Sequence, residues 1–311
     1  MIPAPSRTFT DFLDDLPVSV HDSGTSATVD GDHLEAASPA ELRSHLAAAI
    51  YAHLHIRHPE IQGQVHTRSR DDLTTDLIAA VPHRQIVQAI TGTEPSTRRG
   101  KHRRTVIVEG VKVIVGTEAL VRDDGGVVVG ARFPSWRTRT TPGYLLALGQ
   151  RSVAGARVAR LYLARDDAEQ ALALWGPLLR RLHEEDLAHQ AKALSSSVEY
   201  PRADAIVVYV AEEDVAAAHQ AATRAMGDTP AATVPSSVFT HELAPGIATA
   251  SEPVDPRPAY RQLSFGQHRS RVLAEALIRS ATQRQCMSST WEQDARAALI
   301  DPHAPGRNFA R

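Results

Sequence analysis

An arginine on the apolar face of a helix is the most informative chemical feature of this sequence. Residues 264–277 have a helical pattern, and at about 100° per residue Arg269 falls on the apolar arc, whereas Arg271 falls on the opposite side beside Glu275. The apolar residues of that arc are Phe265, Val272, Leu273 and Ala276. A buried guanidinium without a partner is costly, so Arg269 has to meet a carboxylate of the protein, a ring of carbonyls, or a ligand anion such as phosphate. The sequence leaves these three partners open.

Three further segments place cationic side chains where they could act on an anion. Alternation over residues 158–163 puts Arg160 and Tyr162 on one face of a strand, either as a solvent-facing pair or as part of a site. Lys192 stands in a short apolar-leaning strand, where burial near arginines would lower the pKa of its amine, as a general base at neutral pH requires. Arg202 lies in a turn that opens the next strand, a common position for functional groups.

Common catalytic motifs are absent from the sequence. It contains no Gly-x-x-x-x-Gly-Lys-Ser/Thr loop, no Gly-x-Gly-x-x-Gly, no His-Arg-Asp or Asp-Phe-Gly pair and no Gly-x-Ser-x-Gly elbow, which disfavours kinase, dinucleotide-binding and serine-hydrolase functions. The densest histidine group, His53, His55 and His58, lacks the spacing and the glutamate of a helical zinc site. The single cysteine, Cys286, excludes paired thiolates, so no metal site is expected.

The pattern of secondary structure is mixed. Helices are expected over residues 39–56, 71–81, 166–184 and 212–226, over the Arg269 segment, and from residue 289 onward. Strands are expected over residues 105–109, 111–121, 127–133, 157–164, 190–195 and 204–210, with extended pieces around residues 240 and 248. Residues 94–104 form a basic, glycine-containing connection, which is either a solvated loop or a flap that attracts an acidic or phosphorylated peptide.

These elements predict an α+β fold, with a central, mainly antiparallel sheet flanked by helices and a helical N-terminal lobe. We expect the lobe to span residues 1–100 and an α+β catalytic region to span residues 101–311. With 311 residues and 42% hydrophobic composition, the chain can bury a full core. Its net charge of −2 argues against a nucleic-acid or membrane-surface partner, and the lack of an apolar N-terminal stretch indicates a cytoplasmic protein.

Five segments, taken in order, resemble the Hop-A type III effector family. They are residues 134–144 (PSWRTRTTPGY), 160–162 (RLY), 200–204 (YPRAD), 239–246 (FTHELAPG) and 264–269 (SFGQHR). The similarity runs over about residues 134–280, and residues 1–100 add little beyond a tyrosine- and histidine-rich helix around Tyr51. Actinobacterial members of this family act in ribosomal peptide biosynthesis, notably of class V lanthipeptides and thioamitides.

The resemblance implies a lyase that β-eliminates phosphate from phosphoserine or phosphothreonine in a ribosomal precursor peptide, giving dehydroalanine or dehydrobutyrine. A separate kinase-like partner adds the phosphate first. By similarity to the more distant effector phosphothreonine lyases, Lys192 falls on the lysine base and Tyr162 near the histidine acid. Because this chain has tyrosine where those lyases have histidine, His268, Tyr209 or solvent remain alternative proton donors.

The same resemblance suggests how the phosphate is held. Arg160 falls near a phosphate-binding lysine, Arg269 or Arg271 near the late arginines of those lyases, and Arg202 would join them, so that no metal or organic cofactor is needed. Two other functions remain open. A non-catalytic phosphopeptide- or leader-peptide-binding module would keep the arginines without needing Lys192, and a host-directed type III effector would share the fold but act on a signalling protein.

Overall fold

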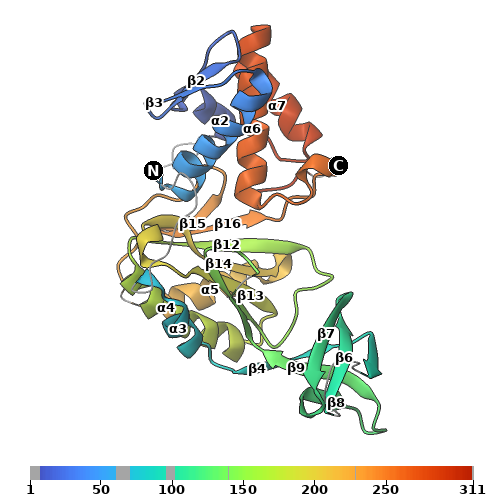
Figure 1. Ribbon diagram of the computed structural model, residues 1–311. Helices are drawn as coiled ribbons and strands as arrows, with labels where there is room; N and C mark the ends of the chain where they lie inside the picture. The colour runs from blue at the N-terminus through green and yellow to red at the C-terminus, as the bar shows by residue number, and fades with distance from the viewer. Residues whose placement is uncertain (1–7, 61–70, 96–101, 139, 228, 310–311) are drawn as a thin grey trace.

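A seven-stranded antiparallel sheet forms the centre of the protein in the computed structural model, which describes residues 8–60, 71–95, 102–138, 140–227 and 229–309 (Figure 1). The strands lie in the order β10-β11-β13-β14-β12-β16-β15. Their bounds in that order are Trp136–Arg137, Tyr144–Leu148, His189–Leu194, Arg202–Ala211, Val158–Arg165, Ile247–Ser251 and His241–Ala244. All six neighbouring pairs are antiparallel, which confirms the predicted class of sheet.

One face of this sheet is covered by α3 (Thr74–Ala79), α4 (Ala168–Glu184) and α5 (Val215–Met226). Leu161 and Leu163 of β12 point into this layer, as alternation along a strand requires. The helix α4 begins at Asp167, whose carboxylate accepts a hydrogen bond of 2.8 Å from the Gln170 amide. The result is an apolar core that supports the back of the sheet.

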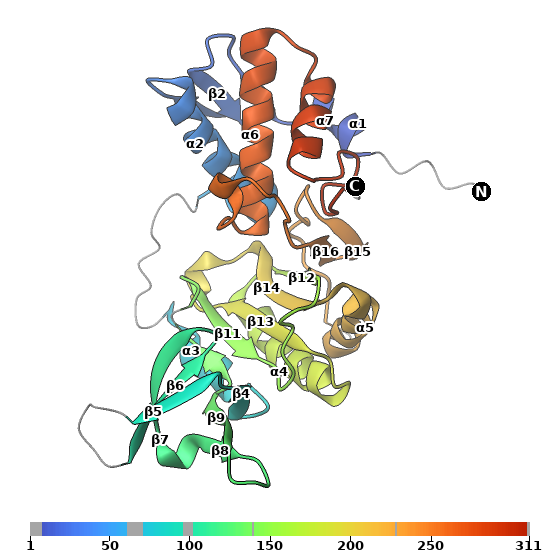
Figure 2. The same ribbon diagram turned by 90° about the vertical axis from the view of Figure 1, so that its right-hand side faces the viewer.

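The other face is covered by residues from both ends of the chain (Figure 2). They belong to α1 (Phe9–Phe12), α2 (Pro39–Ile50), the π-helix η2 (Tyr51–Ile56), α6 (Phe265–Gln283) and α7 (Met287–Ala297). A small sheet of β1 (Val18–Val20), β2 (Ser26–Val29) and β3 (Asp32–Glu35) completes this layer. These elements share one core with the side chain of Tyr162, so the N-terminal segment is held against the sheet over a large separation in sequence.

A second β-rich part lies below the main sheet in Figure 1. It consists of two three-stranded sheets, β4-β9-β8 and β5-β6-β7, around a small core of their own. The strands are β4 (Gln85–Ala89), β5 (Gly92–Pro95), β6 (Arg103–Val108), β7 (Val111–Gly116), β8 (Leu120–Arg122) and β9 (Val128–Pro134). The predicted strand over residues 111–121 is therefore two strands, since a short 3₁₀ turn at Thr117–Ala119 interrupts it.

The predicted α+β class is confirmed, and the helix predicted over residues 39–56 is present as α2 continued by η2. Ser38 caps it as expected, accepting a hydrogen bond of 3.2 Å from the Glu41 amide. The strands β1 to β5, β10 and β11 were not predicted, and most of the basic connection at 94–104 lies outside the described residues. The division at residue 100 stays a prediction. No helix in the described ranges combines the length and the apolar character needed to cross a membrane.

Candidate active site

Lys192 and Tyr162 stand in one row on the sheet face that meets the helical layer. Lys192 of β13 pairs with Val207 of β14, and Val207 pairs on its other side with Tyr162 of β12. Directly paired residues point to the same face, and neighbouring strands are about 4.8 Å apart, so the Cα atoms of Lys192 and Tyr162 are roughly 10 Å apart. The side chain of Val207 lies between them on the same face of the sheet. The next row carries Arg160, paired with Tyr209.

The amine of Lys192 is held over an aromatic ring and lacks a polar partner. Its Nζ lies 3.9 Å from the centre of the Tyr144 ring and makes no hydrogen bond or ion pair within the described part of the chain. Burial lowers the pKa of Lys192 to about 8, with Arg160 and Arg202 adding to the decrease and Asp204 opposing it. About a tenth of this amine is therefore neutral at pH 7 and about half at pH 8.

Arg160 is held by Glu252, the residue that directly follows β16. Its Nε and Nη2 donate to the two carboxylate oxygens of Glu252 at 2.6 and 2.8 Å, and its guanidinium lies 5.1 Å from the centre of the Tyr209 ring. Burial lowers the pKa of Arg160, but Tyr162 and Glu252 outweigh that effect and raise it overall. The guanidinium also faces the Tyr162 hydroxyl, and Nη1 donates to neither oxygen of Glu252, so Arg160 can donate to an anion placed beside Tyr162.

Arg202 is more fully engaged than Arg160. Its Nε and Nη2 donate to the Asp204 carboxylate at 2.8 and 3.0 Å, its Nη1 donates to Glu199 at 3.0 Å, and Nη2 also donates to the Tyr144 hydroxyl at 2.9 Å. Burial raises the pKa of Asp204, but Arg202 overrides this and holds it well below its usual range. The guanidinium and its carboxylates form a closed, buried ion-pair network that orders Tyr144 beneath Lys192.

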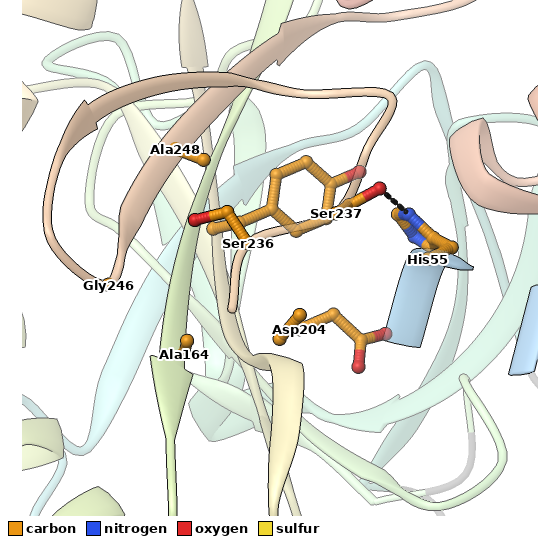
Figure 3. Close-up of a pocket in the computed structure, with 9 residues that line it drawn as sticks. His55, Ala164, Asp204, Ser236, Ser237, Gly246 and Ala248 are labelled. Atoms are coloured by element: carbon orange, nitrogen blue, oxygen red, sulfur yellow. Dashed lines mark hydrogen bonds between the residues drawn. The ribbon is translucent and has the colours of Figure 1, made fainter. Parts of the chain in front are cut away.

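Tyr162 ends in a buried hydroxyl that faces the Arg160 guanidinium and makes no hydrogen bond of normal geometry with the described residues. Burial raises the pKa of this phenol well above its usual value, so the group stays protonated and can donate. Together with His55, Asp204, Ser236 and Ser237, it lines a small enclosed cavity (Figure 3). A buried, unpaired hydroxyl next to a charged network is unusual and marks the row as a candidate for chemistry.

The π-helix η2 closes the site from the helical side with Tyr51 and His55. The Nδ1 atom of His55 lies 2.8 Å from Ser237 Oγ, and its ring meets the Tyr162 ring edge-on at 5.7 Å between centres. A Cβ atom on Gly266 would lie 2.0 Å from Cδ2 of His55, so the glycine of the SFGQHR segment lets α6 approach this ring. Burial lowers the pKa of His55 to about 4, which keeps the imidazole neutral at pH 7.

The helical phase predicted for the SFGQHR segment is confirmed, because Arg269 is fully buried with Phe265, Val272, Leu273 and Ala276. Its partners are neutral groups. Nε donates 2.7 Å to the Pro305 carbonyl, Nη1 lies 2.8 Å from His268 Nδ1, and Nη2 donates 3.4 Å to the Asn308 amide oxygen. Of the three partners left open by the sequence, the structure supplies a carbonyl, joined by an imidazole and an amide. Arg269 therefore anchors the C-terminal segment to α6.

His268 and Arg271 lie apart from the Lys192 row. The other ring nitrogen of His268, Nε2, lies 3.0 Å from Asp255, so both nitrogens have partners. Burial and Arg269 lower the pKa of His268 to about 4. Arg271 is on the far side of the helix, as predicted, with its Nε 3.6 Å from Glu275 and its guanidinium 5.2 Å from the centre of the Tyr260 ring. Neither contacts Lys192, Tyr162 or Arg160 in the described structure.

Of the site residues expected from the sequence, the structure brings together Lys192, Tyr162, Arg160 and Arg202 on one face of the sheet. Sequence reasoning missed the carboxylates Glu199 and Asp204, Tyr144 as a ring under the lysine, and the two residues of η2. For Asp204 a signal was available, since Arg202 and Asp204 are two apart on a strand and share a face. Among the described residues, no group of three or more His, Cys, Asp or Glu side chains is placed to hold a metal ion.

The family model of the HopA1 effector protein family matches residues 136–307, which is more than half of the chain. The chain therefore belongs to this family, and the resemblance drawn from its segments is confirmed. The match includes β12, β13, β14 and α6 but not η2. No curated protein matches the chain significantly.

Two solved structures of effectors are similar to this chain. One is the effector protein from Pseudomonas syringae pv. tomato strain DC3000, with a TM-score of 0.42 and 14% identity over 54% of this chain and 63% of that protein. The other is the effector protein from Pseudomonas syringae pv. syringae strain 61, with a TM-score of 0.47 and 11% identity over 80% of this chain and 85% of that protein. The chain thus spans less than two thirds of the first effector.

Proposed function

We propose that this chain is a lyase that β-eliminates phosphate from phosphoserine or phosphothreonine in a peptide. The observation that carries the proposal is the row of Lys192, Val207 and Tyr162, because it places a partly neutral amine and a protonated phenol on either side of Val207. Val207 is only 1% exposed and packs with Tyr162 under the helical layer, so a phosphorylated side chain reaches this row when that layer moves aside. Bound above Val207, it would have its Cα proton toward the amine and its phosphate toward the phenol and Arg160.

The reaction follows from these positions. Lys192 Nζ takes the Cα proton, the electron pair of that C–H bond forms the Cα=Cβ double bond, and the Cβ–O bond breaks with its electrons on the leaving phosphate. Tyr162 gives its proton to the phosphate, and transfer of the proton from Lys192 back to the phenolate, through solvent, restores both groups. The product is dehydroalanine from phosphoserine or dehydrobutyrine from phosphothreonine. The proposal uses no cofactor.

The three arginines have different roles in the proposed reaction. Arg160 faces the Tyr162 hydroxyl from the next row, so it binds the phosphate and stabilises the charge that develops on it. Arg202 is saturated by Asp204 and Glu199, so its role is to hold Tyr144 beneath the base. Arg269 acts at a distance by fixing the C-terminal segment, since Asn308 links it to the backbone of Glu252, the partner of Arg160.

Tyr162 is the proton donor that this geometry favours over His268 and Tyr209. His268 has both ring nitrogens engaged, and the ring of Tyr209 is stacked on Arg160. The substrate is a phosphorylated ribosomal precursor peptide, and a kinase-like partner would supply the phosphate, as the family resemblance implies. A host-directed effector with the same fold is the second candidate, and the name of the matching family favours it.

The experiment is a metal-free incubation of the purified chain with a synthetic phosphothreonine peptide, with chelator and without ATP. We expect the peptide to lose the mass of phosphoric acid and to gain a double bond that reacts with an added thiol. Release of phosphate with the hydroxyl retained would contradict elimination. Tight binding of the peptide without any product would instead indicate the non-catalytic phosphopeptide-binding module.

A further inference from the structure

A groove of about 660 Å³ runs between α2 and α6 on the helical side of the molecule. It is lined by Arg43, Ala47, Ala48, Tyr51, Leu263 and Arg271, among others. The α2 wall is built from alanines, so the helix presents little side-chain volume there and the space between the helices stays open. The rim, in contrast, is formed by long cationic side chains.

Arg43 and Arg271 share one carboxylate across this groove. Arg43 Nη1 and Arg271 Nε each lie 3.6 Å from the same oxygen of Glu275, too far for a hydrogen bond, and the other oxygen of Glu275 accepts from the Tyr260 hydroxyl. The Nε atoms of both arginines are buried and without a hydrogen-bond partner among the described residues. Two guanidinium groups with one carboxylate leave an excess positive charge, and the side chains of Arg43 and Arg271 are 39% and 32% exposed, so a second carboxylate could bind their exposed nitrogens.

The groove adjoins the candidate active site at Tyr51. Tyr51 lines it, and the same side chain lies 5.3 Å from the His55 ring between centres. Burial raises the pKa of Tyr51, Asp204 raises it further, and the charges of Arg202 and Arg160 lower it, so the phenol faces the charged network of the sheet. A chain segment bound in the groove would therefore lead past Tyr51 toward that network.

We propose that this groove binds the part of the substrate peptide next to its phosphorylated residue, and that it selects peptides with aspartate or glutamate there. The peptide carboxylate accepts from the exposed guanidinium nitrogens of Arg43 and Arg271, and an apolar peptide side chain lies over Ala47 and Ala48. The identification of the bound peptide as the substrate rests on the proposed lyase function. The binding itself does not require that function.

The first test uses binding alone. An unphosphorylated peptide with two acidic residues and a matched peptide with asparagine and glutamine in their place are titrated against the chain at low salt, with fluorescence anisotropy as the readout. We expect the acidic peptide to bind at least about tenfold more tightly, and Arg43→Gln and Arg271→Gln each to remove most of that preference. Equal affinity for the two peptides would overturn the proposal.

The control variant is Arg284→Gln. Arg284 is a strongly exposed arginine whose Nη2 lies 3.3 Å from Asp22, and it does not line the groove. Its loss should leave the preference for the acidic peptide unchanged. An equal loss of preference in Arg284→Gln would show that general attraction between charges, and not the groove, selects the peptide.

Two further variants keep the test valid if an arginine variant folds poorly. Glu275→Gln removes the carboxylate that competes with the ligand, so it should tighten binding of the acidic peptide; weaker binding would count against the proposal. Ala48→Leu narrows the groove without changing charge and should weaken binding of both peptides. Unchanged binding in Ala48→Leu would place the peptide elsewhere.

Turnover separates this inference from the proposed function. With phosphorylated forms of the two peptides, we expect the acidic one to have a lower KM and the same kcat, and Arg271→Gln to raise KM alone. Elimination with equal kcat/KM for both peptides would overturn the proposed selectivity of the groove and leave the lyase function standing. Selective binding without elimination would support the groove as a site for acidic peptides and overturn the proposed lyase function.

Discussion

The two walls of the candidate site differ in origin and in charge. The sheet wall comes from β12, β13 and β14, lies inside the family match at 136–307, and carries ion pairs of arginines with carboxylates. The helical wall comes from η2, lies outside that match, and presents the neutral groups of Tyr51 and His55. Within the proposed function, the sheet thus supplies the reacting groups, while the helical wall excludes water from them.

The difference between the two walls explains why the amine of Lys192 is partly neutral. Burial is the largest cause of the low pKa of Lys192, and the helical layer provides much of the cover over this face of the sheet. The sheet alone would leave the amine near solvent and fully charged at neutral pH. The two walls therefore have separable effects, and the following variants test that separation.

The largest effect is expected for Lys192→Ala. Loss of a general base lowers the rate by about 10²–10⁴-fold, whereas phosphopeptide affinity should change little because Arg160 still binds the phosphate. The measurement is the elimination rate together with the peptide dissociation constant. Lys112, which is exposed and 3.4 Å from Glu94, provides the matched control, and Lys112→Ala should behave as the parent. More than half the parental rate in Lys192→Ala would end the assignment.

The next effect concerns the ion pairs of the sheet wall. Asp204→Ala leaves the Arg202 guanidinium buried without its main partner, which typically costs about 3–5 kcal/mol of stability. Glu94→Ala, which removes the exposed partner of Lys112, should cost less than about 1 kcal/mol. Denaturant unfolding of both variants gives the comparison. Similar losses for the two would show that Asp204 is hydrated and that the sheet wall is more open than described.

The local sequence pattern was sufficient to predict which side chains of the sheet wall share a face, but not which groups they interact with. Alternation placed Arg160 and Tyr162 together, and helical phase placed Arg269 in the core and Arg271 outside it, because each depends only on neighbours along one element. The partners of these cations are set by strand register and by chain ends. Pro305 and Asn308 reach Arg269 across more than thirty residues, a contact that no local period encodes.

The helix that forms the helical wall was predicted as part of residues 39–56, but its position over the sheet was not. His55 appeared only as one of three clustered histidines, and its contact with Ser237 joins residues separated by 182 positions. Strand β11 was missed because its apolar run, Tyr144–Leu148, has no alternation and follows Pro142-Gly143. Without that strand, Tyr144 had no reason to lie beneath Lys192.

A smaller effect is expected at the contact between α6 and η2. Gly266→Ala would push against His55, and overpacking of a buried site costs about 1–3 kcal/mol. Combining it with His55→Ala should recover part of that loss, since the added methyl then has room. A double-mutant cycle on the unfolding free energy measures the coupling. Additive losses would mean that the two residues are not in contact and that the helical wall sits farther from α6.

The smallest effect, and the most direct test of the comparison, is a shift in pH dependence. With the pKa of Lys192 at about 8, kcat/KM for elimination should rise with pH from 6.5 to about 8 and then level off, because only the neutral amine accepts the Cα proton. The lowered pKa of Lys192 also makes the free energy of unfolding depend on pH. Between about 8 and the usual 10.5, the unfolded chain binds more protons at this lysine than the folded chain does, so its destabilising effect is fully present below pH 8 and fades as pH rises through that window.

Tyr51→Ala tests whether the helical wall sets this pKa. The substitution opens the cover where the groove adjoins the site and admits water to the Tyr144–Asp204 cluster, so the pKa of Lys192 should move up toward its usual value. The rising limb of the kcat/KM profile should then shift to higher pH by less than about one unit, while the rate on the plateau changes little because Lys192, Tyr162 and Arg160 are untouched. Tyr51→Phe, which keeps the ring, should leave the limb in place. If the limb stays fixed in Tyr51→Ala while the plateau falls, the helical wall takes part in the reaction directly, and the separation of the two walls is wrong.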